Sequence, residues 1–247
     1  MNKDKEQDCT DNAAVGIDSV SKAFAARLVL DNISLGVIQG QSVCVCGVNG
    51  AGKSTLLRII AGLLRPDQGS VRLCGHNLRT HAERAKAQLG VISHKSMVYP
   101  DLTVFENLFF FAKLYGVKNS AARVDELLDD IGLSSYRYDR ANILSRGLLQ
   151  RLAIARALVH RPIVLLADEP FTGLDAEACQ YLSSILADFA SHGGTTVMTT
   201  HDINAGIQCC DRLVVLDRTH LIFDAMMCDI DTISFARDYL SYARNKN

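Results

Sequence analysis

A glycine-rich run early in the sequence has the residue types and spacing that bind polyphosphate. From Gly47 to Thr55 it matches the pattern G-x-x-x-x-G-K-[ST] at every required position. The backbone N–H groups of such a loop and the dipole of the following helix form a nest for phosphate oxygens. Lys53 is predicted to reach the β- and γ-phosphates of a nucleotide, and Ser54 to place its hydroxyl on Mg²⁺. The predicted loop consists of Gly47, Val48, Asn49, Gly50, Ala51, Gly52, Lys53, Ser54 and Thr55.

An acidic pair follows a continuous apolar run later in the chain. Asp168 and Glu169 come directly after residues 163–167, which have the composition of a parallel strand buried on both faces. Taken alone, such a pair is more often a turn or a helix cap. Beside a phosphate loop, Asp168 is predicted to hold Mg²⁺ through water, and Glu169 to orient or deprotonate an attacking water.

A second anion site is predicted at Ser145, which is expected to cap a long helix running to about residue 160. The local sequence is Leu144, Ser145, Arg146 and Gly147. Because this helix start and the phosphate loop belong to distant parts of the fold, we expect a composite site. One subunit would hold ATP on its loop, and the Ser145 of another would close over the γ-phosphate.

The elements that position these residues form an α/β pattern. The loop lies between a predicted strand at residues 42–46 and a predicted helix at residues 56–61. Two alternating segments, residues 17–24 and 29–37, predict an antiparallel β region ahead of a mainly parallel core. Residues of about 102–160 read as an inserted helical subdomain, which opens with a capping box of Thr103 and Glu106. Phe109 to Phe111 either face another protein or pack on both sides.

Composition limits the remaining choices. The chain has 247 residues and a formal net charge of −1, which gives no reason to expect a nucleic-acid partner. Residues 1–14 are expected to be a disordered polar tail without a signal-peptide core, and residues 15–247 a single domain. The 8 cysteines form no C-x-x-C pair, so they are interpreted as small buried hydrophobes in a reducing cytoplasm.

The ordered set of motifs resembles the ATP-binding-cassette (ABC) ATPases, a P-loop NTPase family, over residues 17 to about 224. The set comprises the phosphate loop, the segment from Leu144 to Gly147, the pair Asp168 and Glu169, the Gly-Leu-Asp ending at Asp175, and Thr-His-Asp around His201. The resemblance implies that His201 is a switch histidine at the γ-phosphate and that Asp175 lies in a loop contacting the other subunit. It also implies that Phe24 stacks on adenine, although Phe24 would equally suit a core position.

Three motifs depart from the family pattern. Arg146 and Leu148 replace a Gly and the Gln of the usual L-S-G-G-Q, and Val48 stands where Pro is common. Lys95 stands at the expected position of a metal-coordinating Gln, and an ammonium cannot donate an oxygen to Mg²⁺. Hydrolysis is therefore expected to be slower than usual, or coupled differently to a membrane partner.

The resemblance implies an ATPase subunit that lies peripherally at the cytoplasmic face of the inner membrane. It would work as a head-to-tail homodimer or pseudo-dimer and drive separate integral membrane permease subunits. In finer detail the motifs look most like the ATPase of haem exporters used in cytochrome c maturation. The alternatives are the ATPase of another exporter (multidrug, lipid or polysaccharide), a soluble ABC ATPase without a transport role, or a degenerate cassette that binds ATP as a structural partner.

Overall fold

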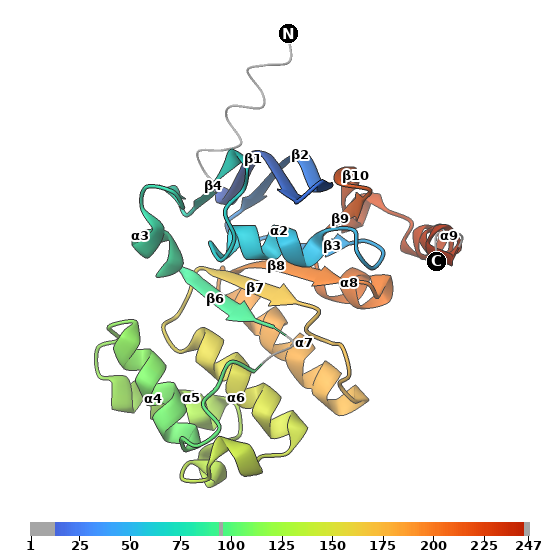
Figure 1. Ribbon diagram of the computed structural model, residues 1–247. Coiled ribbons are helices and arrows are strands. Elements are labelled where there is room, and N and C mark those ends of the chain that lie inside the picture. Colours follow the sequence, from blue (N-terminus) through green and yellow to red (C-terminus); the bar gives the residue numbers. More distant parts are fainter. Residues whose placement is uncertain (1–12, 94–95, 245–247) are drawn as a thin grey trace.

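The strands form two sheets, one mainly parallel and one antiparallel, which share a hydrophobic core. The computed structural model describes residues 13–93 and 96–244. Among these residues, a 6-stranded sheet has the order β10-β9-β3-β8-β7-β6 and a 4-stranded sheet has the order β2-β1-β4-β5 (Figure 1). The first sheet consists of β3 (Ser42–Cys46), β6 (Leu89–Ile92), β7 (Val164–Asp168), β8 (Thr195–Thr200), β9 (Arg212–Asp217) and β10 (His220–Met226). The second consists of β1 (Ala13–Phe24), β2 (Arg27–Ile38), β4 (Gln68–Leu73) and β5 (His76–Asn77).

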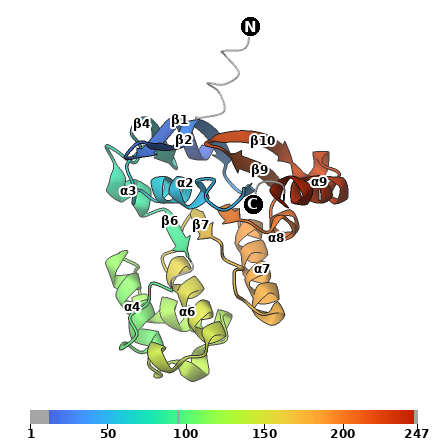
Figure 2. The same cartoon turned by 45° about the vertical axis from the view of Figure 1, so that its right-hand side comes forward.

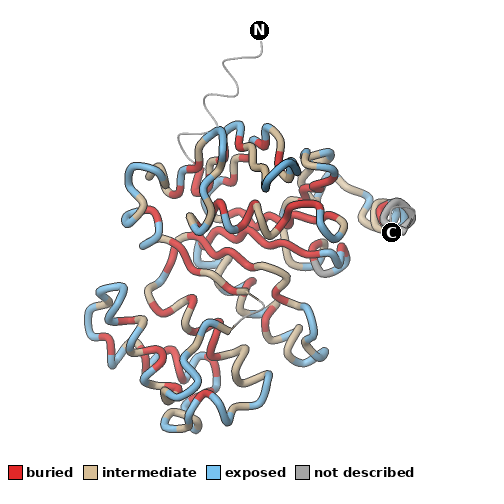
Figure 3. The backbone as a smooth tube through the Cα atoms, in the orientation of Figure 1, coloured by how far each residue is buried: buried red, intermediate tan, exposed pale blue. Residues whose placement is uncertain are grey.

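The larger sheet is the buried centre of the molecule, and its inner strands are parallel. Strands β6, β7, β8, β3 and β9 pair in parallel, and β10 pairs antiparallel with β9 at the edge. Every residue of β3 and β8 is buried, which explains their apolar and β-branched sequences (Figure 3). Because the strands are parallel, the carboxyl ends of β3, β7 and β8 meet at one edge of the sheet, where the candidate site lies.

Helices cover both faces of the central sheet. Helix α2 (Lys53–Ile60) lies between the two sheets, and Val43 and Val45 of β3 share its core cluster. Cys44 and Cys46 point to the other face and pack in a separate cluster. Alternation along β3 therefore divides the core into two layers. The helices on that second face are α7 (Ala176–Ser191) and α8 (Ile203–Cys209). Residues of η3 (Met227–Asp229) and α9 (Thr232–Arg244) pack against the same cluster.

The N-terminal boundary differs from the sequence prediction. Strand β1 begins at Ala13, so Ala13 and Ala14 belong to the sheet and not to the predicted tail. Both side chains are buried, and Ala13 pairs with Ile38 of β2. Two alanines carry little β-propensity by themselves, and pairing with β2 is what places them in the strand.

The helical subdomain has a core of its own. It contains α4 (Val104–Leu114), α5 (Ser120–Asp130), η1 (Ser134–Tyr136), η2 (Ala141–Ile143) and α6 (Arg146–Leu158). Its buried residues form a cluster apart from both clusters of the central sheet. Figure 2 shows α4 and α6 lying away from the antiparallel sheet, on the far side of the central sheet. The capping box of Thr103 and Glu106 is present, with both reciprocal hydrogen bonds made.

The sequence left open whether Phe109 to Phe111 face another protein or pack within the chain. Phe109 and Phe111 stack on rings of this chain, whereas Phe110 is exposed. Phe105 and Phe109 stack with ring centroids 5.4 Å apart, and Phe111 stacks on Tyr99 at 6.2 Å. Phe110 is 42% exposed, and Leu114 one turn later is 66% exposed. The helix is thus packed on two sides and leaves a narrow apolar strip open on α4.

Asn107 fixes the segment that enters the helical subdomain. Its side chain is fully buried, donates to the carbonyls of Tyr99, Leu102 and Thr103, and accepts from the N–H of Tyr99. Asn107→Ala is expected to lower the free energy of unfolding by about 2–4 kcal/mol, because it leaves the N–H of Tyr99 without its acceptor and empties the space of a fully buried side chain. Urea titration measures this change. Asn142→Ala, at an exposed asparagine, is the matched control, and an equal loss in both variants would contradict the assignment.

His160 makes the stability of the fold depend on pH. It stacks face to face on Tyr115 with centroids 3.8 Å apart, and burial lowers its pKa from 6.5 to about 4. The unfolded chain therefore binds a proton between pH 6.5 and 4 that the folded chain does not bind. The free energy of unfolding is expected to fall by about 2–3 kcal/mol as pH drops through this window. His160→Gln should remove this dependence in urea titrations at pH 7.5 and 4.5, whereas His81→Gln, at an exposed histidine, should keep it.

Candidate active site

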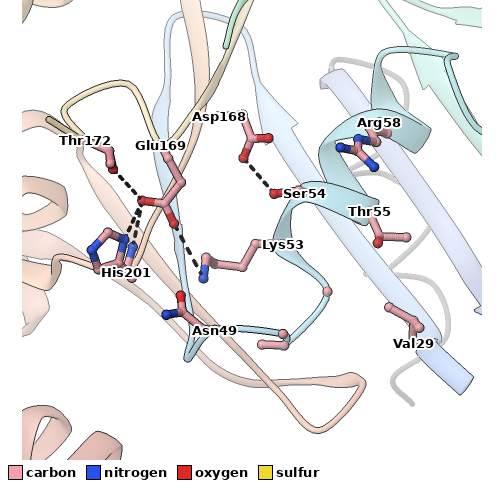
Figure 4. A pocket seen from close by; sticks show the side chains of 13 residues that line it. Val29, Asn49, Lys53, Ser54, Thr55, Arg58, Asp168, Glu169, Thr172 and His201 are labelled. Atoms are coloured by element: carbon pink, nitrogen blue, oxygen red, sulfur yellow. Dashed lines mark hydrogen bonds and ion pairs between the residues drawn. The ribbon is translucent and has the colours of Figure 1, made fainter. Parts of the chain in front are cut away.

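A cavity of about 570 Å³ opens at the carboxyl edge of the central sheet. It brings together the predicted loop, the acidic pair and the predicted histidine, although these lie far apart in the sequence (Figure 4). Its lining residues are Val29, Asn49, Gly50, Ala51, Gly52, Lys53, Ser54, Thr55, Arg58, Asp168, Glu169, Thr172 and His201.

The glycine-rich loop joins β3 to α2 and requires glycine where its backbone turns. Gly52, at the N-cap of α2, has φ +108°, and a Cβ there would lie 2.9 Å from the carbonyl oxygen of Val29. Gly50 has φ +80° and faces open space. Since Gly52 has no side chain, it leaves the first N–H groups of α2 without a side-chain cap. These groups and the positive end of the helix dipole are available to an anion.

Lys53 is the first residue of α2, and only 6% of its side chain is exposed. Its ammonium donates to the carbonyl oxygens of Gly47 at 2.7 Å and Val48 at 3.3 Å. It also lies 3.7 Å from Oε1 of Glu169. A buried ammonium needs compensating acceptors, and phosphate oxygens in the cavity are stronger acceptors than the carbonyls that it now contacts.

Asp168, the first residue of the acidic pair, accepts hydrogen bonds from two hydroxyl groups. Asp168, at the end of β7, accepts on Oδ1 from the Ser54 hydroxyl at 3.0 Å and from the Thr199 hydroxyl at 2.7 Å. This places Ser54 and Asp168 side by side as the sequence predicted for a metal site. In the described part of the chain no cluster of three or more His, Cys, Asp or Glu side chains forms a metal cage. Ser54 and Asp168 fit Mg²⁺ arriving with a nucleotide, since that ion keeps waters and takes phosphate oxygens as ligands.

Glu169 lies in a strained turn. Its φ is +51°, and its N–H donates to the carbonyl of Thr199 at 3.0 Å. Its Oε2 lies 2.7 Å from Nδ1 of His201 and accepts from the hydroxyl of Thr172 at 3.4 Å. A left-handed non-glycine residue costs about 1–2 kcal/mol, so the turn is maintained by its neighbours and aims the carboxylate into the cavity.

Thr172 and Thr199 contribute to the site but were not predicted from the sequence. Thr199 immediately precedes the Thr-His-Asp motif in β8, and Thr172 lies three residues after Glu169. Their hydroxyls donate to the two carboxylates. Position next to a motif is the only signal that the sequence offers for them.

The other predicted site residues lie outside this cavity. In the described residues, neither the segment from Leu144 to Gly147 nor Asp175 contributes to its lining. Ser145 caps α6, with Oγ accepting from the N–H of Leu148 at 3.4 Å. Asp175 caps α7, with Oδ1 accepting from the N–H of Ala178 at 2.8 Å. One chain therefore gathers the phosphate loop with its acids but leaves the Ser145 helix start apart.

Phe24 does not line the cavity that the structure describes. Phe24 is 48% exposed at the end of β1, and Val29, not Phe24, lines the cavity among the described residues. Lys22 lies over the Phe24 ring, with its ammonium 5.5 Å from the centroid. Stacking of Phe24 on adenine stays a prediction. Lys95 lies outside the described residues.

Comparison with known proteins decides the family. Residues 30–172 match the family model described as ABC transporter. The chain belongs to the ABC transporter ATPase family. The Nod factor export ATP-binding protein I of Paraburkholderia xenovorans is 38% identical over 207 residues, which is 83% of this chain and 68% of the relative. An uncharacterised ABC transporter ATP-binding protein of Bacillus subtilis, YdbJ, is 36% identical over 203 residues, 82% and 66% of the two chains.

Solved structures agree with this family. An ATP-binding subunit of an ABC transporter superposes with a TM-score of 0.82 at 27% identity, covering 91% of this chain and 94% of that chain. A dimeric ATP-binding cassette in a post-hydrolysis state, bound to ADP and Pi, superposes with a TM-score of 0.78 at 27% identity, covering 86% and 98%. The chain is thus an ABC ATPase, and it binds and hydrolyses ATP. The predicted α/β P-loop fold is confirmed.

The finer prediction of a haem exporter has no support in these comparisons. The relatives named above carry the names of a Nod factor exporter component and an uncharacterised transporter component. The motifs that suggested haem export are the general motifs of ABC ATPases, so they separate one cargo from another poorly. No helix within residues 13–93 and 96–244 of this ABC ATPase is long and apolar enough to cross a membrane.

Proposed function

We propose that this ABC ATPase powers an exporter as a head-to-tail dimer with two ATP molecules at the interface. The observation that carries the proposal is the division of the site within one chain. Lys53, Asp168, Glu169 and His201 gather around one cavity, while the Ser145 helix start lies outside it. A second copy in the opposite orientation would bring its Ser145 over the open side of this cavity.

The proposed chemistry assigns a distinct task to each side chain. Lys53 and the N–H groups of the loop hold the phosphates of ATP, and Ser54 and Asp168 hold Mg²⁺, which offsets negative charge on those phosphates. Glu169 accepts the proton of the attacking water, and His201 orients the Glu169 carboxylate through the 2.7 Å contact. When phosphate draws Lys53 away from Glu169, Oε1 of the carboxylate becomes available to that water.

The permease partner is proposed from the surface of α4. Its exposed apolar strip, with Phe110 42% and Leu114 66% exposed, suits a contact with separate membrane subunits. The chain would then lie peripherally at the cytoplasmic face of the membrane. For the direction of transport, the Nod factor export name of the relative in Paraburkholderia supports export. We therefore favour an exporter with another cargo, such as a lipid, polysaccharide or drug, over the haem exporter.

Mixing two inactive variants tests the composite site. Lys53→Ala removes the ammonium that holds the phosphates, and Ser145→Arg blocks the helix start that would serve the partner. In a mixed dimer, one site combines both defects and the other is intact. Mixing equal amounts is expected to restore about a quarter of the wild-type ATP turnover, because half the dimers are mixed and each has one intact site.

The control for this mixture places both substitutions in one chain and mixes it with an equal amount of wild type. Each mixed dimer then has two defective sites, one from each substitution, so added double variant should only reduce turnover. Restoration of activity in the first mixture, but not in the control mixture, supports the head-to-tail dimer. Turnover equal to the sum of the two separate variants would contradict it.

A further inference from the structure

The first residue of α6 is a cation at a place where helix electrostatics disfavour it. Arg146 follows the Ser145 cap, and the first turn of α6, which the structure describes completely, contains no acidic residue. The helix dipole makes this end positive, so electrostatic repulsion is smaller when a positive side chain points away from the helix end. The guanidinium of Arg146 reaches instead to Gly173, in the loop that precedes α7.

The guanidinium of Arg146 lies so close to Gly173 that a side chain at residue 173 would collide with it. A Cβ on residue 173 would lie 3.1 Å from Cζ and 3.3 Å from Nη1 of Arg146, and Nη2 would be nearer still. Gly173 also has φ +72°, which disfavours any side chain. An alanine at this position would therefore displace the end of the flexible arginine side chain.

The loop that carries Gly173 also holds the carboxylate of Glu169. The N–H of Thr172 donates to the carbonyl of Glu169 at 3.1 Å, and its hydroxyl lies 3.4 Å from Oε2 (Figure 4). The N–H of Leu174 closes a further turn on Phe171 at 3.3 Å. A short sequence of contacts thus runs from Arg146 through Gly173 and Thr172 to Glu169, all within one chain.

A second arginine fixes α6 against the same region. The guanidinium carbon of Arg151 lies 4.2 Å from the ring centroid of Tyr181 in α7. Its Nη2 lies 3.9 Å from Oε1 of Glu177 in the first turn of α7. Because Glu177 is largely exposed, the ring contact contributes more than the ion pair. Helix α6 and the start of α7 are therefore connected at two levels.

We propose that Arg146 is a positioning residue of the ATPase reaction. Its guanidinium on Gly173 ties the Ser145 segment to the loop that holds Thr172 and Glu169. Movement of α6 during closure then adjusts the Glu169 carboxylate of the same chain. This inference rests on the proposed composite site, in which the Ser145 segment serves the partner's ATP while Glu169 serves the chain's own. Arg146 would link the two sites of the dimer.

Hydrogen exchange tests the contact without any ATP turnover. In the full-length chain, Arg146→Ala is expected to speed exchange of the Thr172 and Leu174 amides at least about fivefold, because the loop loses its contact with the guanidinium. Gly173→Ala should speed the same amides by displacing the guanidinium. Arg140→Ala, at an exposed arginine of the same subdomain, is the control. Unchanged exchange in Arg146→Ala would overturn the proposal.

A double-mutant cycle tests the consequence for ATP hydrolysis. Arg146→Ala and Gly173→Ala are each expected to lower kcat about tenfold, with KM for ATP unchanged because the phosphate loop is intact. The double variant should be no slower than either single variant, since both remove one contact. Gly75→Ala introduces the same backbone strain at φ +77° in open space, and should leave kcat unchanged and add nothing to Arg146→Ala.

The outcomes separate this inference from the proposed function. If Arg146→Ala lowers kcat but Gly173→Ala acts like Gly75→Ala, Arg146 acts directly on the partner's phosphate and the positioning role is wrong. Multiplying effects in the double variant would also overturn it. The mixture of the Lys53 and Ser145 variants tests only the composite site, so its failure counts against the proposed function. The hydrogen-exchange result decides separately whether the contact of Arg146 with Gly173 orders the loop.

Discussion

Glu169→Gln is expected to lower kcat for ATP about 10²–10³-fold and leave KM nearly unchanged. The amide keeps the shape of the side chain, and its oxygen still accepts from His201 and Thr172, so the strained turn should persist. The amide cannot accept the proton of the attacking water at neutral pH. Steady-state release of phosphate measures kcat, and binding of a fluorescent ATP analogue checks that the nucleotide still binds.

The matched control for this variant is Glu83→Gln, at an exposed glutamate of α3 (Ala82–Lys86), which does not line the cavity. It should hydrolyse ATP at the wild-type rate. If Glu169→Gln retains more than about half of the wild-type kcat, a different group takes the proton and Glu169 is not the general base.

Lys53→Met is expected to weaken ATP binding at least about 100-fold, because a charge-assisted contact to the phosphates is lost. Methionine is of similar length and suits a side chain that is only 6% exposed, so the fold should survive. The backbone N–H groups of the loop remain, which limits the loss. Isothermal titration with ATP and Mg²⁺ measures the affinity.

Lys118→Met, at an exposed lysine of the helical subdomain, should bind ATP as the wild type does. A dissociation constant for Lys53→Met within about fivefold of wild type would mean that the ammonium stays on the carbonyls of Gly47 and Val48 when phosphate is bound.

The parts of the site that follow local rules were predictable from the sequence. The turn at Gly50 and Gly52 needs positive φ, and Ser145 caps α6 because a hydroxyl satisfies an exposed N–H at a helix start. Asp168 ends β7, whose four preceding residues are apolar because both faces of the strand are buried. Each of these positions is decided by its immediate neighbours in the sequence.

Features that depend on tertiary contacts were missed. Helix α3 has five residues, no side-chain cap and only Ala85 buried, so it carries almost no periodic signal. Gly206 interrupts the pattern of α8 because a Cβ there would lie 2.5 Å from Sγ of Cys44. The contact of Arg146 with Gly173 joins positions that no local pattern relates.

The cysteines illustrate the same division. Cys44 and Cys46 are buried, as the interpretation of small hydrophobes requires, whereas Cys228 is exposed. Hydrogen bonds with Cys210 and then Cys46, together with burial, raise the pKa of the Cys44 thiol well above its usual range. Cys44 therefore stays protonated at neutral pH and packs as an apolar side chain on the face of the central sheet that α8 covers.

The composite site is tested most directly by the molar mass of Glu169→Gln in solution, measured by light scattering on a sizing column. Slow hydrolysis should trap the closed state, so with ATP and Mg²⁺ the variant is expected to elute at twice the 27.0 kDa of one chain. With ADP, or with Ser145→Arg added to the same chain, the measured molar mass should be 27.0 kDa. A single-chain mass for Glu169→Gln at saturating ATP would contradict the account.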